Sequence, residues 1–108
     1  MSSLSGKFIH HVFFWLNNPD SKEDLAALVA GLKKLAPLDL IKDYHIGVPA
    51  ATDRAVIDRS YAVSWLLVFA TAEDEKSYQT APEHLEFVKE NSSLWAKVVI
   101  YDSVQEPI

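Results

Sequence analysis

The chain has 108 residues and contains no cysteine, one methionine and three glycines. The lack of cysteine excludes disulfide bonds, thiolate metal sites and cysteine nucleophiles. No apolar stretch approaches the roughly 18 residues that a membrane span requires, and the first residues lack the basic and then apolar order of a secretion signal. We therefore expect no membrane partner and a cytoplasmic location.

Basic residues are also scarce, with 10 lysines and arginines against 15 aspartates and glutamates and a formal net charge of -5. Nucleic acids bind to basic protein surfaces, and this chain is acidic, so no nucleic-acid partner is expected. Apolar residues make up 49% and charged residues 23%, which is the balance of a globular protein. A chain of this length builds one core, so we expect a single domain over residues 1–108 with its core at roughly 8–103.

Several catalytic motifs are missing as well. The sequence has no glycine-rich phosphate loop, no His-Glu-x-x-His zinc pair, and no serine or aspartate in a recognisable nucleophile context. Phosphoryl transfer and serine hydrolysis are therefore disfavoured. We expect neither a metal nor a cofactor, and a metal site built from His11 and His84 is the weaker interpretation because no pairing at helical spacing supports it.

What the chain does have is strands that are apolar on both sides. In residues 8–16, one side carries Ile9, Phe13 and Trp15, and the other carries Phe8, Val12, Phe14 and Leu16. Residues 61–70 and 98–101 repeat this pattern. An antiparallel sheet that is apolar on both faces needs two covers, and the chain has helical material for about one. We therefore expect a homodimer in which a second copy seals the uncovered face.

The order of elements predicts the fold class. Ser21 opens a capping box before a leucine stripe that ends at Pro37, and Thr71 and Pro82 open two parts of a second, bent helical segment. Strands are expected at 8–16, 41–48, 61–70 and 96–103, and residues 50–60 are expected to form a loop over one end of the sheet. This is the α+β, ferredoxin-like βαββαβ unit, a four-stranded antiparallel sheet with two helices on one face.

Imidazoles and phenols beside this apolar interior are the candidates for chemistry, because the first can move protons near neutral pH and the second can donate to developing negative charge. They are His10, His11, His45, His84, Tyr44, Tyr61, Tyr78 and Tyr101. His10 and His11 point to opposite faces, and we favour His11 for a ligand site. The uncovered face is expected to present Phe13, Trp15, Val63, Trp65, Leu67, Val98 and Ile100.

Two segments, YQTAPEHLEF (residues 78–87) and LWAKVVIYD (residues 94–102), resemble the signature of the stress-responsive α/β-barrel (Dabb) family. The strand IHHVFF (residues 9–14) and Ser60-Tyr61 resemble the family too, so the likeness covers roughly residues 8–103. The resemblance implies homodimers in which two ferredoxin-like sheets close into an α+β barrel with the helices outside. That the seven residues expected on the uncovered face line a ligand lumen is implied only by this family resemblance. It implies little about function, because most members have no established activity.

A plant polyketide cyclase of this family closes its substrate by aldol condensation without a cofactor. Its histidine and tyrosine match His84 and Tyr78 here, and its first-strand histidine matches His11. The resemblance implies that His84 is the base and that Tyr78 holds His84 or stabilises an enolate. Two further pocket residues of that enzyme are missing here: its third-strand histidine corresponds to Val63, and its first-helix tyrosine falls near Val29. We therefore expect a dimer that binds a small apolar ligand, and the alternative is a cofactor-independent enzyme, cyclase-like or monooxygenase-like, on carbonyl or aromatic substrates.

Overall fold

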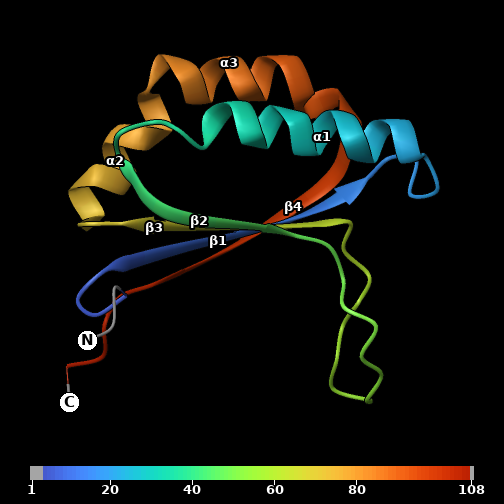
Figure 1. Ribbon diagram of the computed structural model, residues 1–108, viewed down its shortest axis with the longest axis horizontal. Coiled ribbons are helices and arrows are strands. Elements are labelled where there is room, and N and C mark those ends of the chain that lie inside the picture. The colour runs from blue at the N-terminus through green and yellow to red at the C-terminus, as the bar shows by residue number, and fades with distance from the viewer. Residues whose placement is uncertain (1–3, 108) are drawn as a thin grey trace.

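The computed structural model describes residues 4–107 as one sheet with every helix on the same side (Figure 1). The elements are β1 (Phe8–Leu16), α1 (Lys22–Leu35), β2 (Ile41–Gly47), β3 (Val63–Phe69), α2 (Ala72–Thr80), α3 (Pro82–Asn91), a short 3-10 helix η1 (Ser92–Leu94) and β4 (Trp95–Ser103). The strands lie in the order β2-β3-β1-β4, and each neighbouring pair is antiparallel. This confirms the predicted ferredoxin-like βαββαβ fold.

The helix starts follow local sequence signals. The side chains of Ser21 and Thr71 each accept a hydrogen bond of 3.1 Å from the backbone amide three residues further on. Such caps stabilise a helix by about 0.5 to 2 kcal/mol each. The expected bent segment is in fact two helices, because Ala81 is extended and Pro82 occupies the first position of α3.

The core lies between the helices and one face of the sheet. Leu28 and Leu32 of α1 have no exposed surface, and the leucine stripe packs over β3, where Val63 and Leu67 are equally buried. Burial of a large apolar side chain stabilises the fold by about 1.5 to 3 kcal/mol. None of the helices in the described part of the chain is long and apolar enough to cross a bilayer.

The strand register corrects one expectation about the two faces. Val12 pairs with Trp65, and Phe13 pairs with Ser64. Directly paired residues of antiparallel strands project to the same side of the sheet. The seven residues expected on one face are therefore divided: Phe13 and Trp15 lie on the helix-free side, while Val63, Trp65, Leu67, Val98 and Ile100 lie on the helix side. The prediction was wrong because alternation within one strand does not tell which parity of the next strand shares its face.

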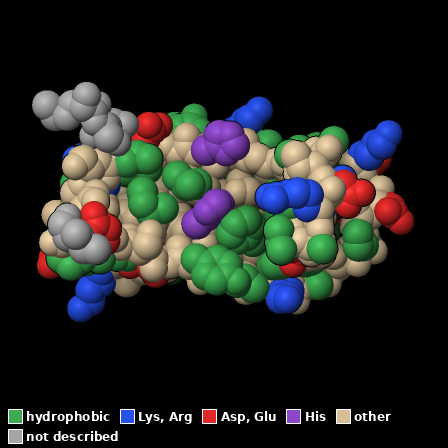
Figure 2. Space-filling model, turned by 90° about the horizontal axis from the view of Figure 1, so that it is seen from below, with side chains coloured by type: hydrophobic (Ala, Val, Ile, Leu, Met, Phe, Trp, Pro, Cys, Tyr) green, Lys and Arg blue, Asp and Glu red, His purple; other side chains and the backbone are tan. Residues whose placement is uncertain are grey.

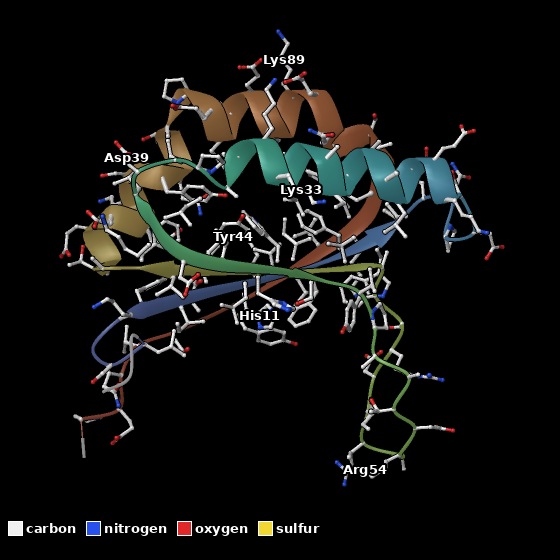
Figure 3. All side chains as sticks on the ribbon, in the orientation of Figure 1. His11, Lys33, Asp39, Tyr44, Arg54 and Lys89 are labelled. Atoms are coloured by element: carbon white, nitrogen blue, oxygen red, sulfur yellow. The ribbon has the colours of Figure 1, made fainter. Side chains whose placement is uncertain are left out.

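The helix-free side of the sheet is flanked by two projecting parts of the chain. The loop between β2 and β3 extends away from the sheet at one end, and both ends of the described chain extend at the other (Figure 1). Arg54 marks the tip of the loop, and His11 lies beneath the sheet (Figure 3). Viewed from below, this face shows hydrophobic side chains around histidines (Figure 2). The expected loop is therefore present, and it projects from the helix-free side.

Candidate functional site

A cavity of about 190 Å³ lies between the helix side of the sheet and the helices α2 and α3. Its walls are formed by His10, Val12, Phe14, Trp65, Tyr78, Gln79, His84, Phe87, Val88, Trp95, Val98 and Ile100. Pockets for drug-sized ligands have about 300 to 1,000 Å³, so this space suits a compact molecule. Most of the walls are apolar, and the titratable groups come from β1, α2 and α3.

A larger hollow of about 340 Å³ lies on the outer surface between α1 and α3, and it is lined partly by Glu83, Glu86 and Glu90. Lys34 Nζ lies 4.0 Å from a carboxylate oxygen of Glu86 and 3.8 Å from one of Glu90, and all three side chains are mostly exposed. Ion pairs of this kind contribute between 0 and about 1 kcal/mol. We favour the smaller cavity as the functional site because it is the one that contains imidazole and phenol groups.

Three rings gather at one end of the cavity. The ring centroid of Tyr78 lies 6.1 Å from that of His10 and 4.5 Å from that of His84. Tyr78 is in the last turn of α2 and His84 is in the first turn of α3. The break at Ala81 brings the two together, because it ends one helix and starts the next between them. These three residues form the polar end of the cavity.

The hydrogen bond of His84 defines its tautomer. Its Nδ1 lies 3.1 Å from the backbone carbonyl oxygen of Gln79. A carbonyl oxygen only accepts, so Nδ1 carries the proton and Nε2 of the neutral ring keeps its lone pair. Burial lowers the pKa of His84 below its ordinary value of 6.5, and the Gln79 carbonyl opposes this. His84 is therefore neutral at pH 7 and can accept a proton at Nε2.

Tyr78 is a donor in the same region. Only 2% of the residue is exposed, and burial raises the pKa of its phenol to about 12, with the Glu75 carboxylate adding to the rise. The indole of Trp65 opposes that rise in pKa and so lies near the phenol oxygen. The geometry falls short of a hydrogen bond, however, and Trp65 Nε1 has no partner among the described residues. At neutral pH the Tyr78 hydroxyl keeps its proton and can donate it in a hydrogen bond.

His10 is held by two carboxylates. Its Nδ1 lies 2.6 Å from Asp102 Oδ1 on β4 and 3.8 Å from Glu75 Oε2 on α2. The residue is 3% exposed. The carboxylate oxygen accepts, so Nδ1–H of His10 donates to Asp102. This pair fixes the orientation of the imidazole at the edge of the polar end.

The structure separates the three residues expected in the catalytic site. His84 and Tyr78 line the cavity, whereas His11 lies on the helix-free side with Nε2 2.7 Å from Ser64 Oγ. Burial lowers the pKa of His11, and the nearby charge of His45 lowers it further. His10, which the sequence alone placed behind His11, is the first-strand histidine of the cavity. Its partner Asp102 is 92 residues away in the chain, so no local pattern indicates the pair.

The expected ligand-binding residues are divided in the same way. Trp65, Val98 and Ile100 line the cavity. Val63 and Leu67 are buried in the core below α1, and Phe13 and Trp15 lie on the opposite face. The apolar walls also include Phe14, Phe87, Val88 and Trp95, which the sequence alone did not single out. Within residues 4–107, no group of three or more His, Cys, Asp or Glu side chains is arranged so that it could hold a metal ion.

The chain is a small α+β domain with a ferredoxin-like sheet. A cavity that contains two histidines and a tyrosine lies between this sheet and the helices α2 and α3. Residues 8–105 match the family described as the stress responsive A/B barrel domain. The match covers most of the chain, so the chain belongs to this family, as its sequence motifs predicted. No curated protein sequence matches the chain.

Solved structures share the fold at low sequence identity. A dimeric ferredoxin-like protein of unknown function from Thermobifida fusca is 18% identical, with a TM-score of 0.74 and coverage of 94% of this chain and 92% of that chain. A Dabb family protein from Mesorhizobium loti is 20% identical, with a TM-score of 0.76 and coverage of 94% and 99%. A hydroxynitrile lyase from Passiflora edulis is 21% identical, with a TM-score of 0.76 and coverage of 94% and 95%. At these identities the likeness shows the fold alone.

Proposed function

We propose that the chain forms a homodimer and that each subunit binds a compact, largely apolar molecule in the cavity between its sheet and its helices. The observation that carries this proposal is the cavity itself, which has apolar walls and a polar end formed by His10, Tyr78 and His84. Convergence of a few polar groups in an apolar hollow is typical of small-molecule sites.

The helix-free face of the sheet supports the dimer. Phe13 of β1, Leu66 of β3 and Val99 of the edge strand β4 lie on this face, and Tyr101 of β4 is 66% exposed there. An apolar sheet face left in water would favour association, and the two projecting parts of the chain leave it open between them (Figure 1). The Thermobifida fusca protein with the same fold is described as dimeric. Sedimentation velocity at micromolar concentration is expected to give twice the chain mass, and a stable single-chain species would refute the dimer.

Native mass spectrometry of the protein purified from its own host tests the binding proposal. We expect a dimer that carries up to two copies of a small molecule. The substitution Val98→Trp places a large ring in the cavity, and it is expected to abolish the bound mass while the dimer persists. Equal ligand occupancy in this variant and in the native chain would show that the molecule binds elsewhere.

A second candidate function is cofactor-independent proton abstraction, which the protonation states at the polar end favour. Neutral His84 can remove a proton from carbon beside a carbonyl, while the protonated Tyr78 hydroxyl donates a hydrogen bond to the enolate oxygen. The proton moves to His84 Nε2 and returns to the same carbon, so no co-reactant is consumed. The hydroxynitrile lyase from Passiflora edulis, which shares this fold at 21% identity, supports this second candidate.

Hydrogen–deuterium exchange separates this candidate from simple binding. Phenylacetone in deuterium oxide should lose its benzylic protons faster with the native chain than without it. His84→Ala is expected to abolish the acceleration while dimer mass and helix content stay unchanged. An undiminished exchange rate in that variant would rule out His84 as the base.

A further inference from the structure

Trp65 carries a buried hydrogen-bond donor that no described residue accepts. Trp65 is 1% exposed, lies in the middle of β3 and lines the cavity. Among residues 4–107, its Nε1 is the one buried side-chain nitrogen or oxygen without a hydrogen-bond partner. An indole N–H can only donate, so it requires an acceptor to be satisfied. Buried polar atoms are paired in the large majority of cases, and each exception calls for an explanation.

No neighbouring side chain in the described part of the chain forms a hydrogen bond with Trp65 Nε1. The ring of Tyr44 packs against the indole at a centroid distance of 5.7 Å, but its side chain is an aromatic neighbour and is not hydrogen-bonded to it. The phenol of Tyr78 lies nearby, yet its geometry to Nε1 falls short of a hydrogen bond. By contrast, Trp15 Nε1 on the opposite face donates to Ser60 Oγ at 3.0 Å. A phenylalanine at position 65 would fill the apolar wall without an unsatisfied donor.

We propose that Trp65 is a specificity-determining residue whose indole N–H, together with the Tyr78 hydroxyl, donates to a neutral carbonyl oxygen of the bound molecule. This inference rests on the proposed binding function and deepens it by naming the ligand class. A carbonyl oxygen has two lone pairs and can accept from both donors. The ligand is therefore a compact aldehyde or ketone with an apolar body along Phe14, Phe87 and Val98.

The charged side chains around the cavity favour a ligand with a neutral carbonyl group over one with a carboxylate. Among the described residues, no lysine or arginine lines the cavity, and the carboxylates of Asp102 and Glu75 lie beside His10 at its polar end. An anion placed there would lose its hydration and lie close to these two carboxylates, which is strongly unfavourable. A neutral carbonyl oxygen meets two donors and adds no charge.

Two probes of nearly identical shape test the inference. Acetophenone carries a C=O group where α-methylstyrene carries C=CH₂, and both are single-ring molecules suited to the cavity. The measured quantity is the ratio of their dissociation constants, from NMR titration of the native chain, Trp65→Phe and the control Trp15→Phe. Loss of one neutral hydrogen bond changes an affinity by about fivefold. We expect Trp65→Phe to weaken acetophenone binding by about fivefold relative to α-methylstyrene, and Trp15→Phe to leave the ratio unchanged.

A second measurement uses the native chain and does not depend on a variant that folds. Indole N–H resonances of the three tryptophans are separable, and Trp65 is assigned by its retention in Trp15→Phe and Trp95→Phe. Acetophenone is expected to shift the Trp65 N–H resonance downfield, whereas α-methylstyrene is not. If both probes bind but neither this shift nor the affinity ratio distinguishes them, the role of Trp65 is refuted. If neither probe binds the native chain, the binding function itself fails, and the inference fails with it.

Discussion

The helix-free face of the sheet gives a sharp test of the proposed dimer. Phe13 lies near the middle of β1 on this face, and its ring packs against those of His11 and Tyr61 at centroid distances of 4.3 and 5.1 Å. The side chain is only partly buried within one chain. Phe13→Asp places a carboxylate in the apolar face and leaves the core between sheet and helices intact.

The expected effect on dimer affinity is large. Complete burial of a phenylalanine contributes about 1.5 to 3 kcal/mol, and part of this is still available to the dimer. A carboxylate buried without a partner costs several kcal/mol after relaxation. A twofold interface repeats each change in both subunits. The sum is at least about 4 kcal/mol, which raises the dimer dissociation constant at least about 1,000-fold.

Sedimentation velocity over a range of protein concentrations measures this shift. The matched control is Leu85→Asp, which adds the same charge at a residue of α3 that is 54% exposed on the helix side. We expect Phe13→Asp to sediment as a single chain and Leu85→Asp to remain dimeric. If Phe13→Asp dimerised as tightly as the control, the helix-free face would not be the interface.

Three further predictions concern stability, each measured by urea unfolding. Leu32→Ala should lower the free energy of unfolding by about 2 to 5 kcal/mol because Leu32 has no exposed surface, and a loss no larger than that of Leu85→Ala would contradict this packing. Ser21→Ala removes the cap of α1 and should cost about 0.5 to 2 kcal/mol, whereas Ser21→Asp should retain most of the stability. The pKa values of His11 and His84 are both lowered, so stability should be constant well above pH 6.5 and decline as pH falls below it, because the unfolded chain binds protons first. A variant with His84→Gln should show a smaller decline, and an unchanged slope would refute the contribution of that residue.

Much of the fold could be predicted because its signals are local. The capping residues Ser21 and Thr71 lie three positions from the amides that they bind, and the leucine stripe of α1 lies within one helix. Pro82 is itself the first residue of α3, a position that proline favours. The order of strands and helices then leaves few arrangements that cover the sheet. Local periodicity and turn chemistry were therefore sufficient for the fold class.

The candidate site depended on information that is not local. The family motif indicated Tyr78 and His84, which are six residues apart and meet across the break between two helices. The choice between His10 and His11 required the pairing of β1 with β3 and β4, since one residue of register decides which face each side chain takes. Asp102 became relevant only once β4 was placed beside β1. Because the register could not be read from the sequence, Trp65 was expected on the uncovered face, whereas it lies on the helix side.

The adjacent histidines of β1 show how one strand serves two separate surfaces. His10 contributes to the cavity and is fixed by Asp102, while His11 contributes to the helix-free face and binds Ser64. The lining residues of the cavity lie on the helix side of the sheet, opposite the face proposed for the dimer. If the chain of Phe13→Asp stays folded as a monomer, its cavity should therefore still discriminate acetophenone from α-methylstyrene. Loss of that discrimination in a folded monomer would show that the dimer shapes the cavity through the sheet. Ligand binding would then depend on dimerisation.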